Sequence, residues 1–345
     1  MGKVRVVLFG VGAMGRRMAR FLIEKEGAEI VGAIDISKDK VGRDLGEVVG
    51  VNKTLGVEIS NDTNAVLSKA KADVMLHTTT SFLKHVYPQI AKALEHGVNV
   101  VSTCEELSYP YIVDEPLARK IDEMARRHGV TVLGTGVNPG FAMDTLPITL
   151  TGACQKVKAI SVTRSLDAAN RRVPFQKKVG AGLSPQDLEQ KLEEREITGH
   201  VGLEQSINLI ASALGWELED VKVAPVEPVI AERRVASKVK GGVTIEAGQV
   251  AGLKQSGWAI KEGKRVITLD MQMYMGAEEY ELYKIEGVPP INMKNTPCMQ
   301  GDLSTVAVIV NSIPKVINAP PGLVTMMDLP IPSATPEDMR KYIKK

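Results

Sequence analysis

A glycine-rich turn restricts the possible folds of this chain more than any other segment. Residues 10–15 read Gly-Val-Gly-Ala-Met-Gly, a G-x-G-x-x-G pattern. Residues 4–9 before it are rich in β-branched side chains, as in a buried strand, and residues 13–26 after it have the apolar spacing of a helix. A strand, a glycine turn and a helix in this order predict the phosphate-binding turn of a dinucleotide-binding unit.

Each residue of the turn has a separate physical role. Gly10 permits the tight turn, Gly12 lets the backbone approach a pyrophosphate, and Gly15 lets the helix pack closely against the strand. Ala13 and Met14 begin the helix, whose free N–H groups and partial positive charge attract phosphate. We therefore predict that this turn binds the cofactor.

An acidic residue after the second predicted strand indicates which cofactor is bound. Asp35 lies 20 residues after Gly15, where a carboxylate binds the ribose 2′-hydroxyl of NAD. The same charge repels a 2′-phosphate. Ser37 and Lys38 follow closely and offer partial accommodation of NADP, although Lys38 is equally well explained as a solvated lysine. We predict NAD or NADP as the cofactor, with NAD favoured.

The first 135 residues alternate between short apolar runs and helical patterns. This alternation predicts an α/β fold whose N-terminal part is a Rossmann-type, doubly wound parallel sheet with helices on both faces. Further strands are expected at 29–34, 57–60, 72–77, 98–102 and 130–133. Helices are expected at 62–70, 82–96 and 115–128, with Asp62 as a cap and Gly97 and Gly129 as terminating glycines.

After Gly134 the pattern changes. The turn-rich stretch 135–140 is a hinge candidate, and the strand-like runs beyond it follow one another closely, which predicts a second α+β domain with a mixed or antiparallel sheet. We expect domains at 1–140 and 141–302, and a C-terminal segment, 303–345, that could return to the first domain. Strands are expected at 156–164, 229–239, 243–254, 265–275 and 280–285, and helices at 184–196, 200–214 and 303–313.

Composition argues against several classes of function. The 345 residues include 43 basic and 41 acidic side chains, so the net charge of +2 predicts no nucleic-acid or membrane-surface partner. No long apolar run predicts a transmembrane helix, and the N-terminus has no signal-peptide pattern. The three cysteines and five histidines are scattered, which predicts reduced thiols, no metal site and a cytoplasmic protein.

Polar residues follow the ends of two further strands, where ligands bind in such sheets. Thr78 and Thr79 follow one strand and could line the ribose and nicotinamide, whereas Thr80 or Ser81 is expected to cap the next helix. Residues 102–107, which follow the next strand, read Ser-Thr-Cys-Glu-Glu-Leu.

The adjacent carboxylates of Glu105 and Glu106 are the most suggestive catalytic feature. Oxidation of an amine needs a proton acceptor, and the developing iminium cation needs a nearby negative charge. A glutamate serves both needs and can activate the water that hydrolyses the imine. The alternative is that both are solvated charges that open the next segment. Cys104 is predicted to be a small packed residue beside the cofactor, not a nucleophile.

These segments resemble the 2,4-diaminopentanoate dehydrogenase family, which includes native amine dehydrogenases. The resemblance rests on the glycine turn and on Ser-Thr-Cys-Glu-Glu-Leu-Ser-Tyr-Pro at 102–110, Gly-Thr-Gly-Val-Asn-Pro-Gly-Phe at 134–141 and Ala-Pro-Pro-Gly-Leu at 319–323. It covers essentially the whole chain, and the Cys-Glu-Glu run is its most specific part.

The resemblance implies a fold related to dihydrodipicolinate reductase and a homodimer. It implies NAD(P)-dependent oxidative deamination of 2,4-diaminopentanoate to 2-amino-4-oxopentanoate with release of ammonia, and in reverse the reductive amination of ketones. The implied catalytic acid is a glutamate of the Cys-Glu-Glu run, and we favour Glu106 slightly over Glu105. Homoserine dehydrogenase has an Asn-Lys pair at this place, and two acids suit a cationic amine better. The His-His and Ser-Gly-Thr-Ala motifs of dihydrodipicolinate reductase are absent from this sequence.

An amino-acid substrate needs cationic partners for its carboxylate, preferably arginine. The candidates are Arg164, Arg171, Arg172, Lys177 and His200, each of which has a surface or structural role as the alternative. The basic run 171–178 is expected in a loop. Asn138, in the hinge, is a candidate contact for substrate or nicotinamide, or only a turn-former before a proline.

Three other functions stay open from the sequence. An amine dehydrogenase that reduces simple ketones with ammonia would share all these motifs. A non-catalytic NAD-sensing regulator would bind NADH without turnover, although no DNA-binding module or basic stripe supports it. An alcohol-forming or semialdehyde dehydrogenase would work without ammonia.

Overall fold

The computed structural model describes residues 2–344, which form two compact units. Unit 1 contains Met1–Phe141 and Gln300–Lys345, and unit 2 contains Ala142–Met299. Within residues 2–344, no helix is long and apolar enough to cross a membrane.

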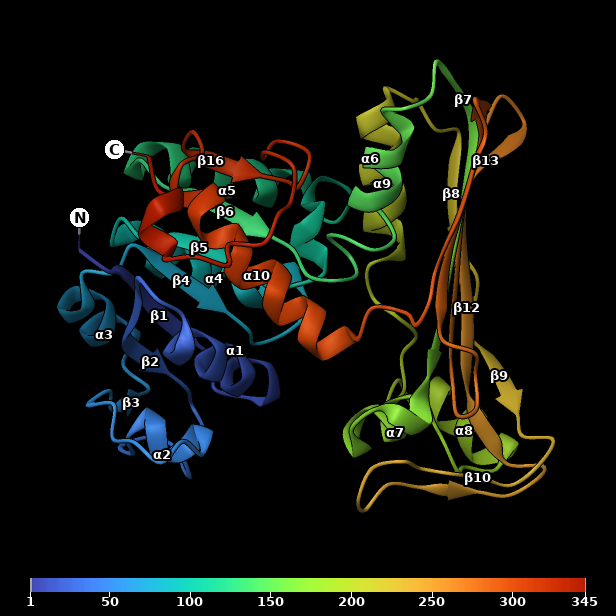
Figure 1. The fold of residues 1–345 in the computed structure, drawn as a ribbon, viewed down its shortest axis with the longest axis horizontal. Coiled ribbons are helices and arrows are strands. Elements are labelled where there is room, and N and C mark those ends of the chain that lie inside the picture. The colour runs from blue at the N-terminus through green and yellow to red at the C-terminus, as the bar shows by residue number, and fades with distance from the viewer. Residues whose placement is uncertain (1, 345) are drawn as a thin grey trace. The chain divides into compact units, whose positions relative to one another are not determined.

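Unit 1 is built on a seven-stranded sheet in which every paired strand is parallel (Figure 1). Its strands are β1 (Val4–Phe9), β2 (Ala28–Ile34), β3 (Ile59–Ser60), β4 (Val74–His77), β5 (Asn99–Ser102), β6 (Thr131–Gly134) and β16 (Gly322–Val324). The spatial order β3-β2-β1-β4-β5-β6-β16 places the topological switch point between β1 and β4. The predicted Rossmann-type parallel sheet is therefore confirmed.

Helices cover both faces of this sheet. One face carries α1 (Ala13–Glu24), α2 (Leu45–Val49) and α10 (Gly301–Ile317), and the other carries α3 (Thr63–Ala70), α4 (Leu83–Glu95) and α5 (Glu115–His128). The two faces bury separate cores, one around Met18 and Ile309 and one around Ile90 and Ile121. Two cores on one sheet explain why its strands are continuous apolar runs.

Local sequence signals set several helix ends as predicted. Asp62 caps α3 by accepting a hydrogen bond from the Ala65 N–H at 2.9 Å. Gly129, which ends α5, has a φ of 68°, in the left-handed region that favours glycine. In unit 2, Ser184 caps α8 by accepting from the Asp187 N–H at 3.0 Å.

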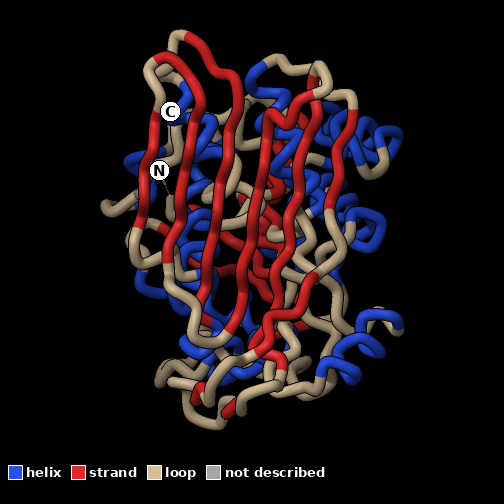
Figure 2. The backbone as a smooth tube through the Cα atoms, turned by 90° about the vertical axis from the view of Figure 1, so that its right-hand side faces the viewer, coloured by secondary structure: helices blue, strands red, loops and turns tan. Residues whose placement is uncertain are grey.

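Unit 2 contains a mixed sheet in which β13 and β7 are parallel and the other pairs are antiparallel. Its strands are β7 (Lys156–Asp167), β8 (Asp220–Val223), β9 (Glu227–Ile230), β12 (Val250–Lys261), β13 (Lys264–Tyr274), β14 (Tyr280–Val288) and β15 (Ile291–Asn295). A separate two-stranded sheet pairs β10 (Val235–Ala236) with β11 (Thr244–Ile245). Figure 2 shows the long strands of the large sheet side by side.

Short helices and one longer helix complete unit 2. They are α6 (Thr145–Thr151), α7 (Val173–Lys178), α8 (Pro185–Glu193) and α9 (Leu203–Leu214). Apolar side chains of α9, including Ile207 and Ile210, share a core with alternate residues of the strands, such as Val162 and Leu269. The predicted second α+β domain with a mixed sheet is therefore confirmed.

Three local predictions in unit 2 are wrong. The single strand expected at 243–254 is divided into β11 and β12 by a turn at 246–249. The single strand expected at 229–239 is divided into β9 and β10, because three consecutive charged residues, Glu232 to Arg234, interrupt the run at the surface. The basic run expected in a loop forms α7 instead. Pro174 stands in the first turn of that helix, where the missing N–H costs nothing and the fixed φ favours helical backbone.

Candidate functional site

The candidate cofactor site lies at the carboxyl edge of the sheet in unit 1. The ends of three strands meet there: the Gly10 N–H donates to the Ile34 carbonyl at 2.8 Å, and the Thr78 N–H donates to the Phe9 carbonyl at 2.8 Å. The Thr78 hydroxyl also donates to the Gly10 carbonyl at 2.8 Å. Thr78 therefore supports the glycine turn from the neighbouring strand, at the switch point where ligands of such sheets bind.

The three glycines of the turn have different surroundings. Gly10 has a φ of +95°, and a Cβ placed on it would lie 2.6 Å from the Thr78 carbonyl oxygen. A Cβ on Gly15 would lie 1.9 Å from the Gly10 carbonyl oxygen. A Cβ on Gly12, the N-cap of α1, would meet nothing within 4 Å. The fold thus requires the first and third glycines, and the second leaves open space before Ala13 and Met14.

Alanine substitutions should separate these roles. Gly15→Ala is expected to lower the free energy of unfolding by about 1–3 kcal/mol, because its Cβ overlaps backbone. Gly12→Ala should change that free energy by less than about 1 kcal/mol, yet raise the Kd for NADH at least about tenfold by filling the approach to the pyrophosphate. Chemical denaturation and a fluorescence titration with NADH measure the two effects. A Gly12→Ala variant with normal NADH affinity would contradict the role of the turn.

Asp35 follows β2 and is nearly buried, with its carboxylate hydrogen-bonded on both oxygens. Oδ2 accepts from the Val11 N–H at 2.8 Å and from Lys40 Nζ at 3.0 Å, and Oδ1 accepts from the Ser37 N–H at 2.9 Å. Burial raises the pKa of Asp35, but the hydrogen bonds from Ser37, Lys40 and Val11 outweigh it, so the net pKa is lowered. Sequence reasoning missed Lys40, whose relation to Asp35 depends on the turn at 37–41.

The two adjacent glutamates occupy different environments. Glu106 begins the short 3-10 helix η1 (Glu106–Ser108), and its Oε2 accepts a hydrogen bond at 2.6 Å from the N–H of Leu83, the first residue of α4. Its side chain therefore caps a neighbouring helix. Glu105 precedes η1 and is half-buried, and its carbonyl accepts from the Ser108 hydroxyl at 2.7 Å.

This cap corrects one prediction about α4. Neither Thr80 nor Ser81 caps the helix, because α4 begins after Phe82, whose side chain cannot accept a hydrogen bond. The carboxylate of Glu106, from the next strand-to-helix loop, takes that place. The negative charge also matches the partial positive charge at the helix N-terminus.

Tight backbone packing fixes the loop that carries the glutamates. A Cβ on Gly134, the last residue of β6, would lie 2.4 Å from the Leu107 carbonyl carbon. The neighbouring hinge is also held, because the Thr135 N–H donates to the Ser102 carbonyl at 2.9 Å and the Val137 N–H donates to the Thr305 hydroxyl at 3.3 Å. Asn138 lies half-buried in this hinge.

A buried histidine joins this loop to the rest of the edge. His77 Nε2 lies 2.6 Å from Gln89 Oε1, an acceptor, so Nε2 carries the proton and Nδ1 accepts from the Ser102 hydroxyl at 2.9 Å. Ser102 Oγ in turn accepts from the Cys104 N–H at 3.1 Å. Burial lowers the pKa of His77 to about 4. The imidazole therefore stays neutral at neutral pH, and the donors and acceptors in this series of hydrogen bonds keep their roles. Thr79 also belongs to it, since its hydroxyl donates to Gln89 Oε1 at 2.8 Å.

Cys104 is a packed residue within this edge. Its side chain is 1% exposed, and burial raises the pKa of its thiol to about 12. The thiol therefore stays protonated and is a poor nucleophile at neutral pH. Within residues 2–344, no cluster of three or more His, Cys, Asp or Glu is placed to hold a metal ion.

The most buried cation of unit 2 is Arg164. Its side chain is 1% exposed on β7, where it lies opposite Glu281 of β14, with 3.6 Å between Nε and Oε1. Nη2 donates to the Met299 carbonyl at 2.7 Å, but Nε and Nη1 have no hydrogen-bond partner among the described residues. The hydroxyl of Tyr283 is likewise buried without a partner there, and burial raises its pKa, so it stays protonated.

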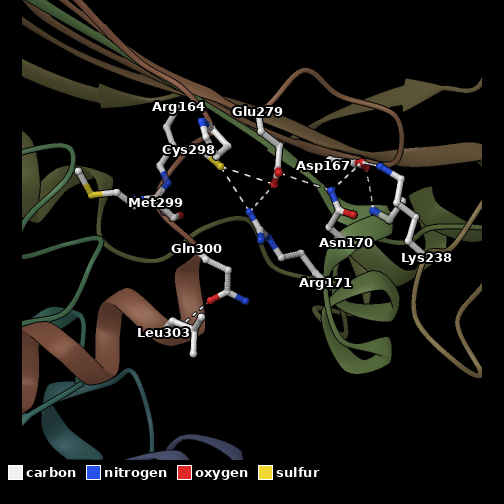
Figure 3. A network of polar contacts seen from close by, with 12 residues as sticks. Arg164, Asp167, Asn170, Arg171, Lys238, Glu279, Cys298, Met299, Gln300 and Leu303 are labelled. Atoms are coloured by element: carbon white, nitrogen blue, oxygen red, sulfur yellow. Dashed lines mark hydrogen bonds and ion pairs between the residues drawn. The ribbon is translucent and has the colours of Figure 1, made fainter.

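The other predicted cations of unit 2 lie in different settings. Arg171 points toward Glu279 and Cys298 (Figure 3), and its Nη2 donates to Glu279 Oε1 at 2.6 Å. Arg172 is the half-exposed N-cap of α7, and Lys177 is exposed in the last turn of that helix. The basic run therefore does not form one cationic site.

The charge of Arg164 acts on His200, whose own side chain is neutral. Burial, together with the neighbouring cations Lys178 and Arg164, lowers its pKa to about 3. The imidazole is therefore neutral near pH 7, so a contact of His200 with the substrate stays a prediction in which the side chain acts as a neutral hydrogen-bonding group. Its main-chain N–H donates to Gln255 Oε1 at 2.7 Å.

Comparison with known proteins extends these observations. Residues 141–345 match the family described as 2,4-diaminopentanoate dehydrogenase C-terminal domain, and residues 4–106 match the dihydrodipicolinate reductase N-terminus. The chain is 37% identical to the 2,4-diaminopentanoate dehydrogenase of Acetoanaerobium sticklandii, over 100% of this chain and 98% of the relative.

Amine dehydrogenases are also among its relatives. The amine dehydrogenase of Streptomyces virginiae is 23% identical over 95% of this chain and 96% of its own length. The solved structure of the amine dehydrogenase from Mycobacterium smegmatis superimposes with a TM-score of 0.82 at 28% identity, covering 97% of this chain and 98% of that one.

Proposed function

Because the chain belongs to the 2,4-diaminopentanoate dehydrogenase family of oxidoreductases that act on amines, we propose that it catalyses the oxidative deamination of 2,4-diaminopentanoate. The substrate, NAD⁺ and water give 2-amino-4-oxopentanoate, NADH, ammonium and a proton. The carbon that bears the 4-amino group loses a hydride to the cofactor, and water replaces the nitrogen. The full-length similarity to a curated enzyme of this name supports the substrate.

The observation that carries the chemistry is the capping role of Glu106. Its carboxylate accepts a hydrogen bond from the Leu83 N–H at the N-terminus of α4, so we assign the acid–base role to the other carboxylate of the run, Glu105. The Glu105 carboxylate accepts a proton from the substrate ammonium and releases it to solvent. Ionised again, it stabilises the iminium cation as the hydride leaves, takes a proton from the attacking water, and returns that proton to the departing nitrogen. The hydrogen bonds that join Cys104 to Ser102 and Ser102 to His77 hold this loop in position.

The cofactor assignment is supported by the edge of unit 1. When bound, the nicotinamide accepts the hydride. The open approach at Gly12 suits the pyrophosphate, and the Asp35 carboxylate suits the ribose hydroxyls and favours NAD. Ile36, next to it, is 84% exposed and offers an apolar surface to the adenine. Thr78, Thr79 and the residues around Cys104 shape the edge beside it.

The substrate carboxylate is assigned to Arg164. Its Nη1 has no hydrogen-bond partner among the described residues, which leaves a charged donor of the guanidinium for a carboxylate. The protonated hydroxyl of Tyr283 offers a further donor. Asn138 and neutral His200 remain candidates for hydrogen bonds to the substrate, and Arg171 and Arg172 are less suited because Arg171 already pairs with Glu279.

One assay series tests the proposed function. The purified chain is expected to reduce NAD⁺ with 2,4-diaminopentanoate, and to oxidise NADH with 2-amino-4-oxopentanoate only when ammonia is present. Turnover of simple ketones with ammonia but not of diaminopentanoate would favour the simpler amine dehydrogenase. Reduction without ammonia would indicate an alcohol-forming enzyme, and NADH binding without any turnover a regulator. Light scattering on the same sample tests the proposed homodimer.

A further inference from the structure

Lys40 lies beside the carboxylate of Asp35, the group proposed to bind the ribose hydroxyls. Its Nζ is 3.0 Å from Asp35 Oδ2, and the side chains of the pair are only 14% and 9% exposed. The turn at 37–41 sets this position, because the N–H groups of Lys40 and Val41 donate to the Ser37 carbonyl at 3.0 and 3.1 Å. The contact is therefore part of a formed turn.

The three groups that bind the Asp35 carboxylate differ in mobility. The Val11 and Ser37 N–H groups belong to the backbone and stay in place. The ammonium of Lys40 stands on a four-carbon stem and can turn to another anion without moving the main chain. Only this one partner can therefore respond to what occupies the ribose site.

An acidic residue alone at this site excludes a 2′-phosphate by repulsion between like charges. Here the charge of Asp35 is already compensated by Lys40, so the repulsion is reduced. With NAD, the ammonium remains on the carboxylate while the ribose hydroxyls donate to it. With NADP, the ammonium turns to the phosphate oxygens, to which it donates a charge-assisted hydrogen bond.

We propose that Lys40 is the residue that decides cofactor specificity, by letting a site with the NAD-type carboxylate of Asp35 also accept NADP. This inference rests on the proposed function only in requiring that unit 1 binds a nicotinamide dinucleotide. Lys40 takes the role for which the sequence offered Lys38. Lys38 is exposed, and the lysine that pairs with Asp35 among residues 2–344 is Lys40.

Direct titration of the full chain with NADH and with NADPH, without substrate, tests the proposal. Lys40→Met keeps the length of the side chain and removes its charge. It should raise the Kd for NADPH at least about tenfold and change the Kd for NADH by less than about threefold. Lys40→Arg should keep the NADPH affinity within about threefold of the wild type. Lys38→Met is the matched control and should leave both values unchanged.

Several results would overturn the proposed role of Lys40 and leave the proposed function standing. These are a wild type that binds NADH but not NADPH, a Lys40→Met variant with an unchanged ratio of the two Kd values, and a Lys38→Met variant that shows the loss instead. Thermal melts show whether each variant is folded, and Lys40→Arg provides the comparison if Lys40→Met is not. If the wild type binds neither nucleotide, the proposed function itself is wrong, and this proposal falls with it.

Discussion

Replacement of Glu105 by Gln is expected to lower kcat for diaminopentanoate oxidation by about 10²–10⁴-fold, the usual contribution of general acid–base catalysis. An amide keeps the size of the side chain but cannot take a proton or carry the charge that stabilises an iminium cation. The Kd for NADH should stay near the wild-type value, because Asp35 and the glycine turn are untouched. Steady-state assays and an NADH titration measure the two quantities.

Glu106→Gln is the matched control one residue away. Its amide oxygen can still accept the hydrogen bond from the Leu83 N–H, so we expect kcat within about tenfold of the wild type. Glu106→Ala removes the cap and should lower the free energy of unfolding by about 0.5–2 kcal/mol. If Glu106→Gln loses activity and Glu105→Gln keeps it, the two roles are reversed. If both keep near-full turnover, a glutamate is not the acid–base group.

The elements with strong local signals were predictable from the sequence. The segment from β1 through α1 to β2 follows from an apolar run, a glycine turn and a helical period, all within neighbouring residues. The ends of α3 and α8 follow from Asp62 and Ser184, because an N-cap acts on residues two or three positions away. Such signals need no knowledge of tertiary structure.

The elements that depend on distant partners were not predictable in this way. β16 has three residues and exists because it pairs with β6, which lies far earlier in the chain. Its residues carry no strand signal of their own beyond a short apolar run. The separation of β9 from β10 likewise reflects their different partners, since β9 pairs with β12 and β10 with β11.

The candidate site shows the same division. The sequence indicates that a carboxylate stands at position 35 and that two stand at 105 and 106, but not what each one contacts. Glu106 reaches Leu83, 23 residues earlier, and only the folded sheet brings their two loops together. Arg164 meets Glu281 because β7 and β14 pair in a register that places them opposite each other. Had that register been known, the pair would have been predictable from charge alone.

Replacement of Arg164 by Lys is expected to raise KM for 2,4-diaminopentanoate by about 10–100-fold, the value of a charge-assisted hydrogen bond lost from a carboxylate. Lysine keeps a positive charge opposite Glu281, which limits destabilisation. Arg164→Met would leave that buried carboxylate without its ion pair and is expected to lower the free energy of unfolding by about 3–5 kcal/mol. The lysine variant loses the Nη1 donor of the guanidinium, which has no hydrogen-bond partner among the described residues.

The same variant should reduce a ketone without a carboxylate, in the presence of ammonia, as well as the wild-type protein does. Such a substrate makes no use of the guanidinium but needs the same acid–base group and the same cofactor, so it separates recognition from catalysis. Arg171→Lys is the matched control. Arg171 already pairs with Glu279, so this substitution should have little effect on KM. Equal losses with both substrates in Arg164→Lys would show that Arg164 stabilises unit 2 and does not bind the substrate carboxylate.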